Sequence, residues 1–319
     1  MKSVAIIGAG QLGSRHLQAL ALYEDPLTIY LVDPVEASRN LSKERFSEVD
    51  QLHNKNIVEA SNMENMPSII DFAVIATTST HRLLALEELL TRSEVKYLLL
   101  EKFLFPQEAE YSTALELISH YDVEVYVNCP RRLWPIYNKI KMDMSHDTNI
   151  NLTVTGSNWN LASNAIHFID LFAFITGESE LCIQTDHLNS ELLSNKRKGF
   201  IEFSGTLEGN TSNNNHFSLT STIDSVSTLT VQFESDQHKY SLHEGNGQIK
   251  IYNLAKDEWF MEEFAVPKQS ELTNLVFKEL FETNYCNLVP YRESAKLHLS
   301  YLKSVNIFLN KNNKEGVIT

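Results

Sequence analysis

Three glycines, Gly8, Gly10 and Gly13, separate an apolar run from a helical pattern near the start of the chain. They form G-x-G-x-x-G between a predicted strand, 4–7, and a predicted helix, 11–22. In this context the motif predicts a turn that binds the diphosphate of a dinucleotide. The first glycine permits the tight turn, the second lets phosphates approach the backbone, and the third lets helix and strand pack closely. A turn that binds nothing is the alternative.

The residues after the glycines complete this predicted cofactor site. Gln11 and Leu12 open the helix, whose free N–H groups and positive dipole end favour a diphosphate. Asp33 ends the next predicted strand, 20 residues after Gly13, where a carboxylate accepts hydrogen bonds from the adenosine ribose. Its charge would repel a 2′-phosphate, so we expect NAD rather than NADP. Arg39 lies close enough in sequence to weaken that preference.

Thr77 and Thr78 follow another apolar run, 72–76. Ligands of open α/β sheets bind at the carboxyl ends of the strands, so we predict both threonines in the cofactor site. His81 has two candidate roles. It either contacts the cofactor or serves only the first turn of the helix that begins there.

Glu101 and Lys102 follow the apolar run 95–100 in the same way. A lysine at this edge points at the crevice where a nicotinamide ring would lie. Positioned lysines exchange protons with carbon-bound oxygen when burial and neighbouring charges lower their pKa. We therefore predict Lys102 as a catalytic residue, and both residues as cofactor contacts. The alternative is that Lys102 is a solvated loop charge.

A predicted helix, 163–176, is apolar at nearly every position but carries Ser163, His167 and Asp170 on one face. A polar stripe on a buried helix needs partners or a ligand. We predict His167 as a second catalytic residue, with a buried core histidine as the alternative. Ser163 and the adjacent Asn164 are predicted to contact substrate, and Asp170 to orient its neighbours.

Arg131 and Arg132 follow the last strand of the alternating region, 123–127. Guanidinium groups suit a substrate carboxylate or phosphate, so we predict both as substrate contacts, with salt bridges inside the protein as the alternative. No group of cysteine, histidine or acidic residues has the spacing of a metal site, so no metal is predicted.

Two regions of the chain, with different secondary-structure patterns, position these residues. Over 1–128, strand and helix patterns alternate, which predicts an α/β Rossmann domain with a doubly wound parallel sheet. Over 129–319, strands with few helical signals predict an α+β substrate and oligomerisation domain with a large open, mostly antiparallel sheet. Residues 208–215 are predicted to form a polar loop tip. For the final helix, 293–310, packing against the first domain is an open alternative.

The composition limits the partners. Lys+Arg number 27 against 41 Asp+Glu, a net charge of −14, which disfavours nucleic acid and anionic membranes. The three cysteines are scattered, no signal peptide pattern precedes the first strand, and no apolar run is long enough to span a membrane. We expect a cytoplasmic protein with a small-molecule substrate. The open sheet predicts a homodimer or homotetramer.

Six segments together resemble the Gfo/Idh/MocA oxidoreductases, the group of glucose-fructose oxidoreductase and inositol dehydrogenase. In family order they are GAGQLGSRHLQAL, ATTSTHRLLALEEL, EKFLF, NCPRRLWP, HFIDLFAFITG and VPYRESAKLHLSYLKSVNIFL. The resemblance covers essentially the whole chain. It implies hydride transfer between nicotinamide and a carbinol or keto carbon of a sugar, cyclitol or nucleotide sugar. It also matches Lys102 to the lysine of the family's Glu-Lys-Pro motif and His167 to its helix histidine.

Two positions depart from the family pattern. Phe103 stands where the family usually has a proline that is often linked to a cis peptide, and a cis bond before phenylalanine is costly. Ser163 stands where the family commonly has an aspartate, four residues before the histidine. These departures keep two other functions open: a non-catalytic, cofactor-binding regulator of the same fold, and a reductase of a non-sugar substrate, as in the related biliverdin reductases.

Overall fold

The computed structural model describes residues 1–195, 197–223, 226–254 and 256–318. They form two compact units. The first unit contains Met1–Pro130 and Pro267–Arg292, and the second contains Arg131–Val266 and the chain from Glu293 onward.

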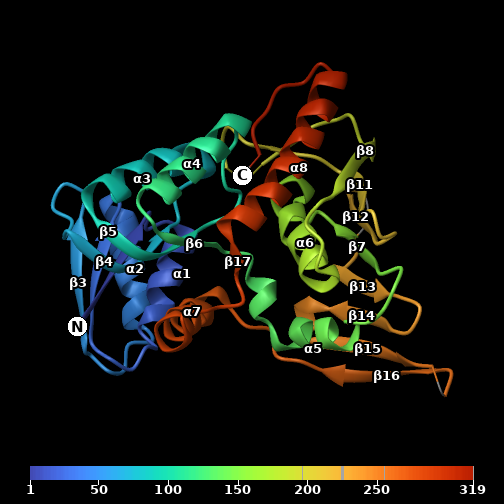
Figure 1. The fold of residues 1–319 in the computed structure, drawn as a ribbon, viewed down its shortest axis with the longest axis horizontal. Coiled ribbons are helices and arrows are strands. Elements are labelled where there is room, and N and C mark those ends of the chain that lie inside the picture. The colour runs from blue at the N-terminus through green and yellow to red at the C-terminus, as the bar shows by residue number, and fades with distance from the viewer. Residues whose placement is uncertain (196, 224–225, 255, 319) are drawn as a thin grey trace. The chain divides into compact units, whose positions relative to one another are not determined.

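The first unit is built on a seven-stranded sheet with the strand order β17-β6-β5-β4-β1-β2-β3 (Figure 1). Neighbouring strands are parallel, except that β17 pairs antiparallel with β6. The strands are β1 Lys2–Ile7, β2 Leu27–Val32, β3 Lys55–Ala60, β4 Ile69–Ile75, β5 Glu94–Leu100, β6 Glu124–Val127 and β17 Val289–Pro290. The helices of this unit are α1 Gln11–Leu20, α2 Glu36–Ser47, α3 Ser79–Arg92, α4 Glu108–His120 and α7 Gln269–Thr283.

The apolar runs of the sequence became the centre of this sheet. Val4, Val74 and Leu98, from β1, β4 and β5, are all fully buried. Continuous burial is expected for parallel strands that helices cover on both faces. The carboxyl ends of these three strands lie next to one another at one edge, because the strands are adjacent and parallel. The predicted doubly wound sheet is therefore confirmed.

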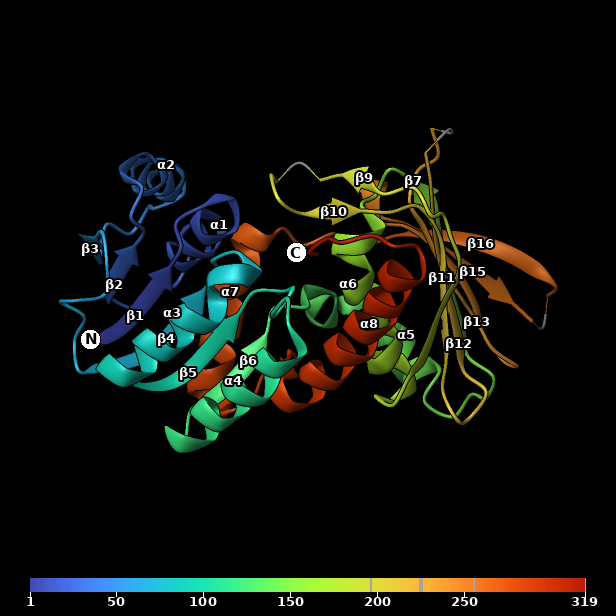
Figure 2. The same ribbon diagram turned by 90° about the horizontal axis from the view of Figure 1, so that it is seen from above.

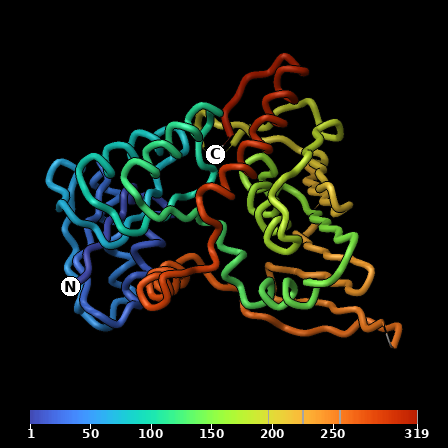
Figure 3. Tube along the Cα trace, viewed as in Figure 1, coloured from blue at the N-terminus to red at the C-terminus, as the bar shows by residue number. Residues whose placement is uncertain are grey.

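A late segment of the chain returns to the first unit. Figures 1 and 3 show α7, in orange-red, beside the blue α1. The Phe277 ring of α7 makes edge contacts with Tyr23 and Phe72, at centroid distances of 4.8 and 5.5 Å. The sequence assigned everything after residue 128 to the second domain. The structure instead places 267–292 in the first unit, because α7 buries its apolar face there.

The second unit is built on an eight-stranded sheet with the order β16-β15-β14-β13-β7-β12-β11-β8. Its pairs are antiparallel except for β7 with β12, which confirms the predicted mostly antiparallel sheet. The strands are β7 Asn151–Ser157, β8 Cys182–Leu188, β11 Gly205–Asn210, β12 His216–Thr222, β13 Thr230–Glu234, β14 Lys239–His243, β15 Gln248–Asn253 and β16 Glu258–Glu263. A small hairpin pairs β9 Leu193–Ser194 with β10 Ile201–Glu202.

Three helices gather on one face of this sheet: α5 Pro135–Asp143, α6 Leu161–Thr176 and α8 Tyr291–Lys311 (Figure 2). Alternate residues such as Val154 and Phe233 are fully buried on the helix side. The final helix, α8, belongs to the second unit from Glu293 onward. The predicted loop 208–215 is partly wrong, because β11 continues to Asn210 by pairing with β12.

Candidate functional site

The turn after β1 gives each of its three glycines a different environment. Gly8 has a φ of +91°, which L residues rarely adopt, and a Cβ there would lie 2.9 Å from the nitrogen of Thr77. A Cβ on Gly13 would lie 1.7 Å from the carbonyl oxygen of Gly8. Among the described residues, a Cβ on Gly10 would meet no atom within 4 Å, and Gly10 is exposed. The protein itself therefore requires glycine at positions 8 and 13, whereas Gly10 only keeps the space before the turn open.

Helix α1 begins beside this open space. No side chain caps the helix, and its first turn has no acidic residue, so the N–H groups of Gln11 and Leu12 lack intrahelical acceptors. Arg45 of α2 adds a positive charge, donating to Ser14 Oγ at 2.5 Å and to Gln11 Oε1 at 2.9 Å. N–H groups, helix dipole and guanidinium all favour an anion here. The sequence had given no signal that Arg45 lies at this position.

Asp33 lies over the glycine turn, as the motif predicted. Its Oδ2 accepts the N–H of Ala9 at 2.7 Å, and its Oδ1 accepts the N–H of Val35 at 2.8 Å. A carboxylate has about four lone-pair sites, so these two bonds leave capacity for hydroxyl donors. The guanidinium of Arg39 already has partners, because it donates to the Asp33 carbonyl and lies 3.6 Å from a carboxylate oxygen of Glu59. Arg39 is therefore less available to bind a 2′-phosphate.

The two threonines after β4 have different surroundings. Thr78 Oγ1 lies 2.9 Å from Nδ1 of His81, in the first turn of α3. These contacts fit the helix-serving role of the exposed His81, and cofactor contact by it stays a prediction. The hydroxyl of Thr77 is buried and has no hydrogen-bond partner in the part of the chain that the structure describes. A buried hydroxyl without a partner at a strand end is ready to accept a ligand group.

The side chain of Glu101 is directed into the protein, and its contact with a cofactor stays a prediction. Only 3% of it is exposed. Its Oε1 lies 2.7 Å from His16 Nε2 and accepts a hydrogen bond from Asn128 at 2.6 Å. Burial alone would raise the pKa of Glu101, but His16 and Asn128 outweigh burial and hold the pKa below its ordinary value. The buried Glu101 carboxylate therefore links α1 to the ends of β5 and β6.

Lys102 follows directly and is partly exposed at the carboxyl edge of β5. The peptide bond between Lys102 and Phe103 is cis. The turn therefore has a cis bond at the position where the family pattern places proline, although the residue here is phenylalanine. Phe103 itself is fully buried.

In the second unit, a buried carboxylate that the sequence did not reveal holds the start of α6. Glu202 of β10 accepts the N–H of Ala162 at 2.8 Å, the hydroxyl of Ser163, and the side-chain amide of Asn195 at 2.9 Å. The first-turn N–H groups of α6 have no cap from Asn160, so Glu202 takes that role. The hydroxyl of Ser163 is thereby engaged by Glu202, and its contact with a substrate stays a prediction.

Asn164 and His167 are the accessible polar pair on α6, three residues apart and both partly exposed. The amide of Asn164 donates to the carbonyl of Trp159 at 2.8 Å. Asp170, by contrast, is 1% exposed and paired with Arg132. His167 belongs to the second unit and Lys102 to the first, so their meeting in one site stays a prediction.

Both arginines predicted to hold substrate have carboxylate partners. Arg131 makes a two-pronged pair with Glu244, with distances of 2.7 and 2.6 Å. Arg132 contacts Asp170 at 2.9 Å and Glu293 at 2.8 Å. Burial opposes the charge of Arg132, but Asp170 raises its pKa above the ordinary value. The salt-bridge alternative is therefore what the structure shows, and a substrate anion would have to displace these carboxylates.

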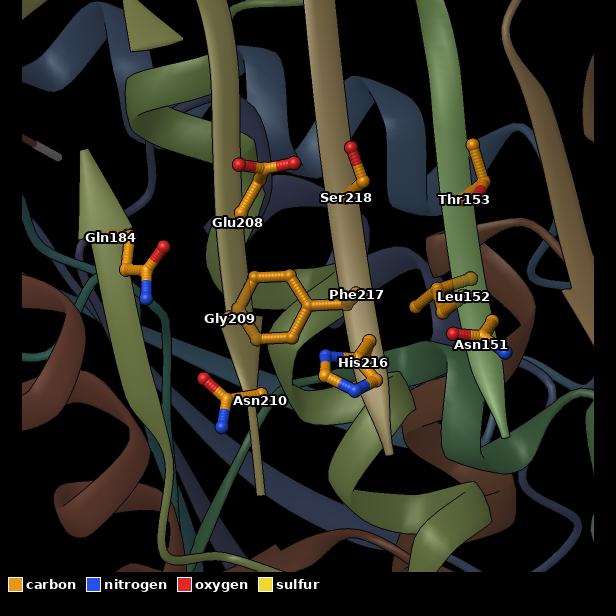
Figure 4. A pocket seen from close by; sticks show the side chains of 10 residues that line it. All are labelled: Asn151, Leu152, Thr153, Gln184, Glu208, Gly209, Asn210, His216, Phe217 and Ser218. Carbon is orange, nitrogen blue, oxygen red and sulfur yellow. The ribbon is translucent and has the colours of Figure 1, made fainter. Parts of the chain in front are cut away.

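A cavity of about 390 Å³ lies on the sheet face of the second unit that faces away from its helices (Figure 4). Polar side chains dominate its lining, among them Thr153, Glu208 and Ser218. None of the predicted site residues lines this cavity. The concavity belongs to the open sheet rather than to the strand-end site of the first unit.

Comparison with solved structures identifies proteins that have the same fold. The sequence matches no family model and no curated protein. Solved structures match over almost the whole chain. UDP-N-acetylglucosamine 3-dehydrogenase GnnA from Acidithiobacillus ferrooxidans is 12% identical with a TM-score of 0.71, covering 95% of this chain and 96% of that one. A Gfo/Idh/MocA family oxidoreductase from Vibrio cholerae is 13% identical with a TM-score of 0.68, covering 98% and 99%.

This chain has the fold of a Gfo/Idh/MocA family oxidoreductase. A super-repressor mutant of Gal80p from Saccharomyces cerevisiae shares it, at 14% identity and a TM-score of 0.72, covering 97% of this chain and 96% of that one. At these identities the likeness concerns the fold. In the residues described, no helix combines the length and the apolar character that crossing a membrane would need.

Proposed function

We propose that this protein is an oxidoreductase that uses a nicotinamide dinucleotide and acts on a carbinol or keto carbon. The observation that carries the proposal is the turn after β1. Its open space at Gly10 faces an uncapped helix start, and the Asp33 carboxylate accepts the N–H of the neighbouring Ala9. At the adjacent strand end, the buried Thr77 hydroxyl has no hydrogen-bond partner among the described residues. Helix start, glycine and acidic residue are the features that bind a dinucleotide in this type of sheet.

The residues of the first unit fit such a cofactor. The N–H groups of Gln11 and Leu12 would hold the diphosphate over Gly10, and Asp33 would accept the ribose hydroxyls. The carboxylate favours NAD over NADP, since Arg39 is already engaged by Glu59 and the Asp33 carbonyl. When bound, the dinucleotide supplies the hydride acceptor, or the donor in the reverse direction.

Lys102 is proposed as the acid/base at the edge of this site. In the oxidation direction its neutral amine would take the proton from the substrate hydroxyl, and a bound dinucleotide would supply the acceptor for the hydride of the same carbon. In reduction the ammonium returns that proton to the oxygen. His167 is proposed as a second acid/base, and Asn164 as a hydrogen-bonding contact for substrate hydroxyls.

The proposed substrate is a sugar, cyclitol or nucleotide sugar. Its support is the shared fold with GnnA, a UDP-N-acetylglucosamine 3-dehydrogenase, and the accessible amide–imidazole pair on α6. We further propose that the protein works in the cytoplasm as a homodimer or homotetramer. The uncovered face of the eight-stranded sheet, with its exposed Trp259 and Met261, is the surface available for a second copy.

The test combines binding with turnover. NADH is titrated by its own fluorescence, because all three tryptophans lie in the second unit. The wild type should bind NADH, and Asp33→Ala should bind it more weakly. A panel of sugars, inositols and nucleotide sugars is then followed at 340 nm. Lys102→Met should lower turnover by about 10²–10⁴-fold. Full activity in both Lys102→Met and His167→Ala would contradict the acid/base assignment.

A non-catalytic regulator that binds the dinucleotide is the second candidate. Two observations favour it: the fold is shared with Gal80p, and Ser163 at the start of α6 is committed to Glu202 rather than available for chemistry. This candidate predicts NADH binding with no turnover on any member of the panel. Turnover that depends on Lys102 would exclude it.

A further inference from the structure

Arg82 is a charged side chain buried deep in the first unit. Only 2% of it is exposed. It lies on α3, and its guanidinium donates to three main-chain carbonyl groups, those of Thr77, Phe103 and Leu104, the last at 3.0 Å. One planar guanidinium with five donors thus joins two strand ends that are distant in sequence.

These carbonyls belong to the two segments that form the proposed site. Thr77 follows β4 and contacts the glycine turn, since its nitrogen lies 2.9 Å from the place of a Cβ on Gly8. Phe103 and Leu104 follow Lys102 directly, beyond the cis peptide. Arg82 therefore ties the backbone after Lys102 to the strand end beside the glycine turn.

The backbone before Lys102 is held as firmly. Glu101 bonds to His16 of α1 and to Asn128 after β6. The residues on both sides of Lys102 are therefore anchored by buried side chains, while Lys102 itself is partly exposed. An acid/base group works only when it is held within a small distance of the reacting atom, and that precision comes from the residues that support it.

We infer that Arg82 is the positioning residue for Lys102, fixing the turn that presents its amine at the carboxyl edge of β5. This inference rests on the proposed function, in which that amine is the acid/base. Arg82 has no role in proton transfer itself. The turn that carries the lysine is held by a guanidinium from α3, although phenylalanine stands where the Gfo/Idh/MocA pattern usually has proline.

The test observes Lys102 directly and needs no substrate. Lysines of the full-length protein are labelled by reductive methylation with ¹³C-formaldehyde and followed by NMR, and the Lys102 signal is assigned by its loss in Lys102→Arg. Arg82→Met and the milder Arg82→Lys are compared with the wild type. The matched control is Arg92→Met, on the same helix, whose exposed guanidinium pairs with Glu88 one turn away.

The Lys102 signal should move toward the position of solvent-exposed lysines in Arg82→Met, move less in Arg82→Lys, and stay unchanged in Arg92→Met. The signal of Lys96, on β5 over the rings of Tyr97 and Phe281, should remain in place in every variant. The inference would be overturned if the Lys102 signal stayed in place in both Arg82 variants. It would also be overturned if the Lys96 signal moved as far as the Lys102 signal, because that would indicate a general loosening of the unit.

NADH binding separates this inference from the proposed function. Arg82→Met should keep its Kd for NADH within about threefold of wild type, because the diphosphate contacts lie on α1. Its Lys102 signal should respond to NADH less than the wild-type signal does. If the wild type binds no NADH, the proposed function fails, whereas the comparison of Lys102 signals without cofactor still decides the role of Arg82.

Discussion

Alanine at Gly10 and alanine at Gly13 should have opposite effects, although the two glycines lie in one motif. A methyl group at Gly10 meets no atom within 4 Å in the described part of the chain, and the backbone there is extended, with φ −69° and ψ −160°. Alanine fits this conformation and restricts the unfolded chain. Gly10→Ala should therefore raise the free energy of unfolding by about 0.4–1 kcal/mol, or leave it unchanged.

The same methyl group should oppose the cofactor, because it fills the space that a diphosphate would occupy. Forcing a methyl into a filled contact costs about 1–3 kcal/mol. The Kd of Gly10→Ala for NADH should accordingly rise by about 5- to 150-fold. Gly13→Ala is the contrasting variant. Its Cβ would lie 1.7 Å from the Gly8 carbonyl oxygen, so α1 must shift and the unfolding free energy should fall by about 3 kcal/mol or more.

Urea unfolding and NADH fluorescence titration measure both quantities on the same samples. Gly10→Ala should be as stable as the wild type and deficient in binding, whereas Gly13→Ala should be deficient in stability. If Gly10→Ala bound NADH with the wild-type Kd, the space at Gly10 would not be the diphosphate site. If it lost more than about 1 kcal/mol of stability, the turn would not have the open geometry described above.

Three further predictions test separate parts of the structure. Asp33→Asn should weaken NADH binding and narrow the preference for NADH over NADPH, because it removes the charge that repels a 2′-phosphate; an unchanged ratio of the two Kd values would contradict this. Glu202→Ala should lower the unfolding free energy by about 2–4 kcal/mol, since it leaves buried donors unsatisfied. The control, Glu208→Gln on the exposed sheet face, should change that free energy by less than about 0.5 kcal/mol. Equal losses for the two variants in urea unfolding would refute the capping role of Glu202. His16 holds the pKa of Glu101 below its ordinary value, so this carboxylate stabilises the fold above its unfolded pKa, and that contribution is lost as the pH falls through the folded pKa. Unfolding free energies should thus decline below about pH 4.5 and decline less steeply in Glu101→Gln, and parallel curves for the two proteins would count against it.

Much of the first unit could be predicted from the sequence because its signals are local. The apolar runs of β1, β4 and β5 and the glycine turn between β1 and α1 are each contained in a few consecutive residues. Helix α2 gave no such signal, since only Ser42 and Phe46 of its twelve residues are buried. The edge strand β3 was missed for the same reason, because its residues are exposed or only partly buried.

The site was predicted well where one segment forms it and poorly where distant segments meet. Asp33 reaches the turn through the strand next to β1, a geometry that the motif already implies. Glu202 lies in a strand pattern and caps a helix that begins about 40 residues earlier, so nothing local indicates its burial. Arg131 likewise finds Glu244 across 113 residues of chain. Two adjacent arginines looked like an anion site because their internal partners cannot be seen in sequence.

A crystal structure of the full chain with NAD⁺ bound would test most directly whether the glycine turn holds a dinucleotide and presents its reactive ring to Lys102. It should show the diphosphate on the N–H groups of Gln11 and Leu12, the adenosine ribose hydroxyls on Asp33, and the nicotinamide ring at the carboxyl edge of β5 beside the Lys102 amine. A turn left empty at a saturating NAD⁺ concentration, or a ring held away from that edge, would contradict the central claim.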